Sequence, residues 1–337
     1  MLYVTTRNDQ NVYTAHRVLQ ENRAEDGGFY IPFHAPSFSE ADIASLRDKS
    51  FNQSIADVLN IIFGTALTSW DIDFCVGRYP VRLKKMGHRI AISESWHNPG
   101  WNFQRMVDNL TAILSGEQTI PTELVKIAVR IAVLFGVFGE LQRDGIERVD
   151  VSAVSGDFSV PISAWYARKW GLPIGNIICC CNENNNLWDL FCHGHMRTDS
   201  LCVSTIVQEA DITLPSHLER LISESGGIEE VNRYLDCSRS GYPYVPDERV
   251  LHELRQGIYV SVVSSKRIEE IIPNVYRSHG YIMEPSAALA YAGLMDYRSK
   301  TGVTRHAIVM SEKSPVLDTK IISNLLGVSE DELRQLI

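Results

Sequence analysis

Residues 149–181 read VDVSAVSGDFSVPISAWYARKWGLPIGNIICCC. The valine-rich run at residues 149–154 predicts a strand, and Ser155-Gly156-Asp157 predicts a turn into a helix that ends near residue 170. The apolar run at residues 174–181 predicts a second, buried strand. A strand, a helix and a strand within about 30 residues form a βαβ unit with parallel strands. This stretch therefore predicts an α/β fold built on a parallel sheet.

Strands and helices alternate on both sides of this unit. The expected elements are a strand from residue 91, a turn at Asn98-Pro99-Gly100, helices over residues 103–113 and 122–141, strands over 257–263 and 307–310, and helices over 285–295 and 318–326. Residues 1–85 read as a smaller mixed unit. It has a short strand at residues 29–32, a helix capped by Ser39 and a helix over residues 54–63. We therefore expect two domains, residues 1–85 and residues 86–337.

The composition of the 337-residue chain excludes several classes of protein. With 32 basic and 41 acidic residues, the formal charge is −9, which argues against nucleic acid or an anionic membrane as a partner. No apolar run reaches the roughly 20 residues of a membrane span. The first residues, Met1 to Arg7, show no secretion signal. The seven cysteines fit a reducing compartment, so a cytoplasmic location is expected.

The cysteines do not predict a metal site. Cys179, Cys180 and Cys181 are consecutive in a predicted strand, where neighbouring side chains point to opposite faces. The run Cys192-His193-Gly194-His195 matches no familiar zinc spacing and is expected at a helix end or in a loop. We expect the thiols to be small buried apolar groups and no metal to be bound.

Several separated motifs occur in a fixed order along nearly the whole chain. They are Tyr3-Val4-Thr5-Thr6-Arg7, Asp26-Gly27-Gly28-Phe29-Tyr30-Ile31-Pro32, Gly171-Leu172-Pro173-Ile174 followed by Asn182-Glu183-Asn184, and Glu284-Pro285-Ser286-Ala287-Ala288. In this order they resemble the Y-x-S-T-R-G, D-G-G-L-Y-V-P, G-L-P-I…T-N-E-N and D-P-H-T-A segments of threonine synthase of the fungal and enterobacterial type. The chain is therefore identified as similar to that family.

The resemblance implies a fold-type-II pyridoxal-phosphate (PLP) fold. Such a fold has a three-layer, parallel-sheet core of the tryptophan-synthase-β kind, here with a small N-terminal α+β domain. In this family a lysine forms a Schiff base with PLP, a glycine-rich loop at a helix N-terminus holds the phosphate, and a hydroxyl-bearing residue commonly faces the pyridine nitrogen.

The lysine position is changed in this chain. The family segment F-H-G-P-T-L-A-F-K-D corresponds to residues 96–105, with His97, Pro99 and Phe103 in register, so Gln104 stands where the lysine would be. A carboxamide only donates and accepts hydrogen bonds and forms no imine. The resemblance therefore predicts that lysine-bound PLP chemistry is closed to this chain.

The phosphate loop and the pyridine-side turn are changed as well. The family's P-T-G-N-F-G corresponds to residues 154–159, where Asp157 replaces an amide and Ser159 replaces the second glycine. A carboxylate there would repel a phosphate. Residues 155–157 also resemble the family's substrate loop, S-G-D-T-G, but the downstream Gly171-Leu172-Pro173-Ile174 favours the phosphate-loop alignment. Glu312 falls where the hydroxyl residue would be. Only 51 residues separate Gln104 from Gly156, so the subdomain that closes over the cofactor is expected to be reduced or missing.

Three functions stay open from the sequence. The first is a degenerate or repurposed homologue, a pseudoenzyme. It would bind an amino-acid-like or phosphorylated metabolite or a partner chain, either as a homodimer or with a hetero-partner. The second is a cofactor-independent enzyme of amino-acid or specialised-metabolite biosynthesis, with His97, Asp157 and Glu312 as candidate catalytic residues. The third is an enzyme that binds PLP non-covalently or through another lysine; Lys313 is the example, although a solvated surface charge is expected there. No cofactor is otherwise expected. The predicted ligand pocket consists of His97, Asn102, Phe103, Gln104, Ser155, Gly156, Asp157, Phe158, Ser159, Glu312 and Ser314.

Overall fold

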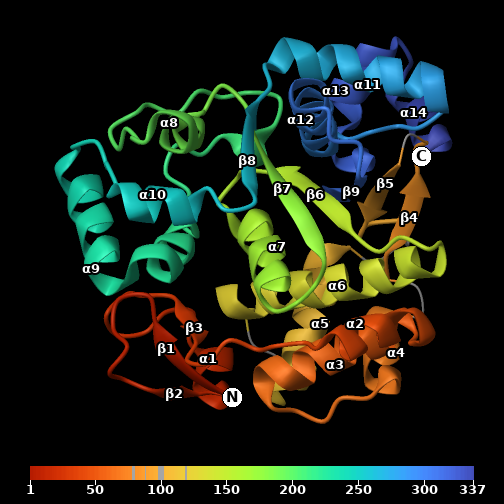
Figure 1. The fold of residues 1–337 in the computed structure, drawn as a ribbon. Helices are drawn as coiled ribbons and strands as arrows, with labels where there is room; N and C mark the ends of the chain where they lie inside the picture. Colours follow the sequence, from red (N-terminus) through yellow and green to blue (C-terminus); the bar gives the residue numbers. More distant parts are fainter. Residues whose placement is uncertain (78–79, 88, 98–101, 118–119) are drawn as a thin grey trace.

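A six-stranded sheet with the order β4-β5-β9-β6-β7-β8 runs through the computed structural model, which describes residues 1–77, 80–87, 89–97, 102–117 and 120–337 (Figure 1). The strands are β4 (Arg82–Lys85), β5 (Ile90–Glu94), β6 (Val149–Val154), β7 (Ile174–Cys181), β8 (Ile258–Val262) and β9 (His306–Ser311). Among the described strands of this sheet, only the pair β4–β5 is antiparallel. The predicted parallel sheet and the α/β fold are confirmed.

The last strand in the sequence lies in the middle of the sheet. β9 pairs with β5 up to the register Glu94↔Ser311, and on its other side it pairs with β6 from Val149↔His306. The carboxyl ends of β5, β6 and β9 therefore meet at one edge of the sheet. Ligand clefts of open α/β sheets form at such an edge.

Helices cover both faces of the sheet, so the architecture has three layers (Figure 1). On one face, Ile178 and Cys180 of β7 point into a core shared with α11 (Ser265–His279) and α12 (Pro285–Thr301). On the other face, Ile177 and Cys179 point into a core shared with α6 (Glu123–Arg143) and α7 (Ser159–Lys169). This alternation follows from the two-residue period of a strand.

The remaining elements surround this core. They are β1 (Leu2–Thr5), β2 (Tyr13–Thr14), β3 (Tyr30–Pro32), α1 (Ala15–Gln20), α2 (Glu40–Ser45), α3 (Phe51–Phe63), α4 (Ser69–Val76), α5 (Phe103–Ser115), α8 (Asn186–His193), α9 (Leu218–Ser240), α10 (Glu248–Leu254), α13 (Thr319–Leu326), α14 (Glu330–Leu336) and the 3-10 turns η1 (Leu46–Asp48), η2 (Gln208–Ala210) and η3 (Pro315–Asp318). Among the described helices, none combines the length and the apolar character that crossing a membrane requires.

The N-terminal residues form a three-stranded antiparallel sheet, β2-β1-β3, beside helices α1 to α4 (Figure 1). The predicted cap of α2 is confirmed, because the Ser39 side chain accepts from the Asp42 backbone N–H and the Asp42 carboxylate accepts from that of Ser39. α3 stacks on α6, so this region shares a core with the main sheet. β4, which the predicted boundary at residue 85 places in the first domain, pairs with β5 in the main sheet. The division into two domains stays a prediction.

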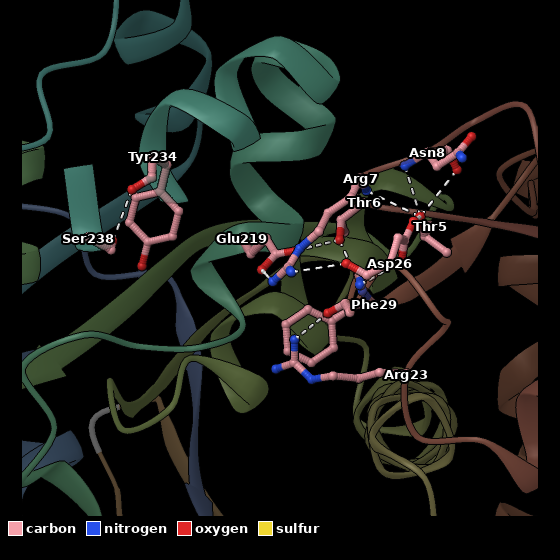
Figure 2. Close-up of polar contacts among 12 residues, drawn as sticks. Thr5, Thr6, Arg7, Asn8, Arg23, Asp26, Phe29, Glu219, Tyr234 and Ser238 are labelled. Atoms are coloured by element: carbon pink, nitrogen blue, oxygen red, sulfur yellow. Dashed lines mark hydrogen bonds and ion pairs between the residues drawn. The ribbon is translucent and has the colours of Figure 1, made fainter. Parts of the chain in front are cut away.

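An ion pair joins the N-terminal sheet to α9 (Figure 2). The guanidinium of Arg7 donates to both carboxylate oxygens of Glu219, at 3.0 and 2.9 Å, and the Thr6 hydroxyl donates to the same carboxylate. The side chain of Glu219 is 4% exposed and that of Arg7 is 19% exposed. Phe29 lies beside this pair with the Arg23 guanidinium stacked on its ring.

The segment between β5 and β6 is short. Its described residues form the two helices α5 and α6 and contain no strand. The reduced or missing closing subdomain stays a prediction. The predicted turn at residues 98–100 lies outside the described residues.

Candidate functional site

A small cavity of about 100 Å³ lies where the carboxyl ends of β6 and β9 meet the N-terminus of α12. Its walls combine apolar side chains with carboxyl groups, one ammonium and one hydroxyl: Ala153, Val154, Val160, Glu209, Glu284, Ser286, Met310, Glu312 and Lys313. This volume is below the roughly 300–1,000 Å³ of pockets that hold drug-sized ligands. The cavity is therefore suited to a small polar molecule.

Lys313 is held between two carboxylates of this site. Its Nζ lies 2.9 Å from a Glu209 oxygen and 3.0 Å from an Asp318 oxygen, and its side chain is 26% exposed. Burial lowers the pKa of Lys313, but the bonds to Glu209 and Asp318 outweigh this and raise the pKa above its ordinary value. The amine is therefore an ion-paired ammonium instead of the expected solvated surface charge, and in this state it is no nucleophile.

Glu284 is a buried carboxyl group in the cavity wall. It caps α12, since it accepts hydrogen bonds from the backbone N–H groups of Ser286 (2.6 Å) and Ala287 (2.7 Å). Burial raises the pKa of Glu284 to about 8, with a smaller contribution from the neighbouring carboxylates of Glu209 and Asp318. A carboxyl group in this state is able to donate a proton at neutral pH.

Glu312 is fixed by an arginine from the opposite helix layer. Arg130 of α6 donates to both carboxylate oxygens of Glu312 at 2.8 Å, and its guanidinium lies 4.5 Å from the ring centre of Phe103. The third nitrogen, Nη1, is buried and has no hydrogen-bond partner among the described residues. The place that the sequence resemblance gives to a hydroxyl group facing the pyridine nitrogen thus holds a bidentate ion pair.

Asp157 occupies the N-terminus of α7. Its Oδ1 accepts from the Ser159 N–H at 2.8 Å, while Phe158 has a left-handed backbone (φ 72°). The carboxylate therefore satisfies a helix-terminal amide that the phosphate loop of the family would offer to its anion.

A second group of polar side chains adjoins Asp157. Nε2 of the buried His217 lies 3.1 Å from a Glu123 oxygen and 3.8 Å from an Asp157 oxygen. Burial lowers the pKa of His217, and the hydrogen bond from His217 is the main cause that lowers the pKa of Glu123 to about 2. Arg220 donates to Nδ1 of His217 at 3.2 Å, so the ring hydrogen is on Nε2 and points at the carboxylates.

Within the described part of the chain, Glu123, Asp157 and His217 are also the residues that lie close enough to share a metal ion. Three observations favour a hydrogen-bonded cluster over a metal centre. The Nε2 atom carries hydrogen, the Arg220 guanidinium contacts the same ring, and Lys126 lies 2.9 Å from the other oxygen of Glu123. A divalent ion would have to displace the hydrogen and tolerate both cations.

The predicted pocket residues on α5 do not line the cavity. The exposed side chain of Gln104 donates to Asp108 at 2.8 Å. Asn102 caps α5 by accepting from the Arg105 N–H at 2.8 Å, and Phe103 is buried under Arg130. His97 follows β5 by three residues and places Nδ1 3.2 Å from the carbonyl oxygen of Glu94.

The predicted residues after β6 and β9 lie at the correct edge of the sheet. Glu312 lines the cavity, and Ser314 caps the 3-10 turn that follows it. Gly156 lies under η2, where an added Cβ would come within 3.0 Å of the carbonyl oxygen of Glu209. The side chains of Ser155, Phe158 and Ser159 are buried beneath this loop.

Among the polar cavity residues, three were not predicted: Glu209, Glu284 and Ser286. The dipeptide Glu284-Pro285 is a recognisable helix start and could have indicated a carboxylate at a helix N-terminus. Glu209 carries no such signal, because η2 reaches the site through a long loop and its place depends on the tertiary structure. Conversely, the motif residues Asn182 and Asn184 are buried and bond to the 203–211 loop, so they hold that loop instead of facing a ligand.

Comparison with known proteins bears on the sequence and the fold of the chain. Residues 2–78 match the family model "Threonine synthase N terminus". Human threonine synthase-like 1 is 29% identical over 147 residues, which are 42% of this chain and 20% of that protein. Threonine synthase of Pseudomonas aeruginosa is 29% identical over 158 residues, 46% of this chain and 33% of that enzyme. These matches therefore span a third or less of the relatives' own length.

Solved structures resemble the whole chain. PLP-bound threonine synthase from Brucella melitensis superposes with a TM-score of 0.85 at 17% identity, covering 97% of this chain and 92% of that one. Yeast threonine synthase superposes with a TM-score of 0.84 at 17% identity, and the match covers 99% of this chain and 93% of the yeast chain. At this identity the likeness concerns the fold. By its N-terminal family-model match and its sequence relatives, the chain is similar to threonine synthases, and it has the fold of the type-II PLP enzymes.

Proposed function

We propose that this protein is a repurposed threonine synthase homologue that uses no lysine-bound PLP and binds a small amino-acid-related metabolite in the cavity at the ends of β6 and β9. The observation that carries the proposal is the Arg130–Glu312 ion pair. It fills the position that the resemblance gives to the pyridine-side hydroxyl, and its carboxylate also forms part of the cavity wall.

The residues present do not fit the lysine-bound cofactor. Gln104 has no amine to form an imine, and its side chain is exposed and bonded to Asp108. Asp157 places negative charge where a phosphate would bind, and its Oδ1 already accepts the Ser159 N–H. The cavity of about 100 Å³ is small for a phosphorylated pyridine ring. These observations support a function without this cofactor.

The charges of the cavity favour an amino acid as the ligand. Glu209 and Glu312 are complementary to an ammonium group and Lys313 is complementary to a carboxylate. A bound amino acid would share these groups with their ion-pair partners in the protein, which include Arg130 and Asp318. Ala153, Val160 and Met310 provide an apolar wall for a short side chain. An unphosphorylated ligand is favoured over a phosphorylated one, because Asp157 already occupies the N-terminus of α7.

The test combines cofactor and ligand binding. The purified protein is expected to show no imine absorbance band with PLP, and borohydride treatment should leave every lysine unmodified in the mass spectrum. A reduced adduct on Lys313 would instead support the displaced-lysine enzyme. In a thermal-shift assay with glycine, L-alanine and L-serine, at least one should raise the melting temperature. Glu209→Gln should remove that effect and the exposed Glu253→Gln should retain it, whereas loss of the effect in both variants or in neither would contradict the proposed site.

A cofactor-independent enzyme is the second candidate, and Glu284 favours it. A cavity-lining carboxyl group with a pKa of about 8 is a plausible general acid. This alternative predicts turnover of a ligand found by the thermal-shift assay. The conversion of that ligand would be followed by NMR. Turnover by the natural chain that is lost in Glu284→Gln would show that the protein is an enzyme and not only a binding protein.

We further propose a cytoplasmic protein that pairs with a second copy of itself. The support is α4, which exposes Trp70 (80%) and Phe74 (87%) one helical turn apart. Large exposed apolar groups often mark interaction surfaces. Light scattering is expected to show a dimer for the natural chain and a monomer for the double variant Trp70→Gln, Phe74→Gln.

A further inference from the structure

A second cavity, of about 290 Å³, opens at the amino-terminal edge of the sheet. It lies where β5 and β9 begin and α6 ends, at the opposite ends of these strands from the cavity described above. Its lining residues are Lys85, Gly87, Arg89, Ile90, Ala91, Leu141, Asp144, Ile146, His306 and Ala307. Its volume is close to the lower limit for pockets that bind small organic ligands.

Positive charge dominates the polar part of this cavity. The only carboxylate among the lining residues, Asp144, is paired with Lys85 at 2.8 Å. Arg89 donates to a backbone carbonyl, that of Thr304 (3.4 Å), and Arg298 behind it donates to the carbonyl oxygens of Arg89 (3.2 Å) and Arg305 (2.6 Å). Burial and the nearby Arg89 and Arg298 lower the pKa of His306. This local excess of positive charge contrasts with the net charge of −9 of the chain.

The backbone at this cavity is held in an unusual conformation. Arg89 has φ 60°, and within the described ranges the other non-glycine residue with positive φ is Phe158, at the candidate site. Two donors hold the Arg89 carbonyl in place, the Ala307 N–H (2.9 Å) and the Arg298 guanidinium. Left-handed backbone at a bulky residue persists where the surrounding structure fixes it, commonly beside a ligand.

From these observations we propose that the cavity is a second ligand site, for a small phosphate monoester with an apolar body. The phosphate would contact Arg89, Lys85 and His306, since guanidinium and ammonium groups are the preferred partners of phosphate. The body would lie on Ile90, Leu141 and Ile146, which form the apolar wall. This site is separate from the proposed amino-acid site and does not depend on it.

Phenyl phosphate is the probe for this site, and calorimetry is the measurement. It should bind at least tenfold more tightly than inorganic phosphate, which lacks the apolar body, and than phenol, which lacks the charge. Arg89→Gly should weaken binding of phenyl phosphate at least tenfold without loss of the fold, because glycine accepts positive φ freely. The matched control is Lys266→Gln, an exposed lysine on α11 outside the cavity, which should bind as the natural chain does.

NMR identifies the place of binding. Saturating phenyl phosphate should raise the pKa of His306, because the bound anion offsets the repulsion from Arg89 and Arg298. No binding by the natural chain, equal binding by Arg89→Gly, or an unchanged His306 titration would each overturn the proposal. Glu209→Gln, which tests the amino-acid site, should leave phenyl phosphate binding unchanged. If this variant lost phenyl phosphate binding, the anion would bind at the other edge of the sheet, and the proposal would be overturned.

Discussion

Glu284 makes the stability of the folded protein depend on pH, and a single substitution at Glu284 tests this dependence. An ordinary glutamate titrates near 4.3, and burial raises the pKa of Glu284 to about 8. A raised carboxyl pKa stabilises the folded state only while the group is protonated. Its contribution is therefore complete below about pH 4 and is lost as the pH rises from about 4 to about 8.

We expect Glu284→Gln to lose less of its free energy of unfolding than the natural chain does between pH 5 and pH 8, by on the order of a few kcal/mol. The glutamine oxygen replaces one of the two carboxylate oxygens that accept the capping N–H groups of α12, and its amide nitrogen cannot accept the other; the comparison therefore uses the pH dependence of stability and not its absolute value. Urea unfolding at both pH values measures the difference. Glu123, with a pKa of about 2, stays ionised throughout this range. Parallel stability profiles for the two proteins would show that Glu284 is ionised in the fold.

Individual site residues were only partly accessible to sequence reasoning. The alignment of the C-terminal turn finds Glu312, which lines the cavity, whereas the alignment with the lysine segment leads to Gln104, which lies outside it. Glu209 approaches the cavity from a loop more than 50 residues beyond Val154, and no local pattern gives its position. The exposure of Gln104 was equally out of reach, since it depends on how α5 rotates above the sheet.

At the scale of helices and strands, periodicity predicts the central elements well and fails where a helix contains a breaker. α5, α6, β6, α7 and β7 follow regular apolar patterns and are confirmed. α9 was not predicted, because Gly227 interrupts it with a left-handed backbone (φ 74°). α11 was not predicted either, and it contains Pro273 in its interior. At Gly227 the helix is interrupted, as the glycine indicates, whereas in α11 tertiary packing overrides the local preference of Pro273.

Pro273 therefore offers a stabilising substitution. A proline inside a helix lacks the N–H that would bond to the carbonyl of Glu269 and crowds that carbonyl. Pro273→Ala should raise the free energy of unfolding by about 1–3 kcal/mol, part of the gain being offset by the more flexible unfolded chain. The control Glu269→Ala, exposed on the same helix, should change it by less than about 0.5 kcal/mol. Urea denaturation compares them, and a less stable Pro273→Ala would mean that the ring packs better than alanine.

At the scale of the molecule, the Arg7–Glu219 pair connects the first strand to α9 across more than 200 residues (Figure 2). Removing one partner of a buried pair leaves the other charge uncompensated, which typically costs about 3–5 kcal/mol. Since this pair is partly exposed, we expect Arg7→Met to lower the free energy of unfolding by about 3 kcal/mol or somewhat less.

The matched control is Arg17→Met. Arg17 pairs with Glu21 on the surface, where both side chains are about 40% exposed, and its loss should cost much less stability than the loss of Arg7. Hydrogen exchange should show faster exchange in β1 to β3 for Arg7→Met only. If both substitutions changed stability and hydrogen exchange equally, the Arg7–Glu219 pair would be no stronger than an exposed surface pair.

The overall architecture was predictable because motifs spread over nearly the whole chain indicate the family resemblance, and that family has a three-layer fold. The cavity was not, because it depends on where three loops meet.

The central place of β9 has a consequence for how the protein is made. The parallel neighbour of β5 is β9, which lies more than 200 residues later in the chain, and β6 also pairs with β9. Neither pair can form before β9 has been synthesised. At a translation rate of about 5–20 residues per second, the ribosome needs roughly 10–40 s to synthesise that interval. During this time the nascent chain carries apolar strands with open edges, which other chains could join. We therefore expect the newborn protein to depend on chaperones until β9 has left the exit tunnel, and removal of the chain from β9 onward to cost both solubility and ligand binding, because Met310, Glu312 and Lys313 line the proposed site.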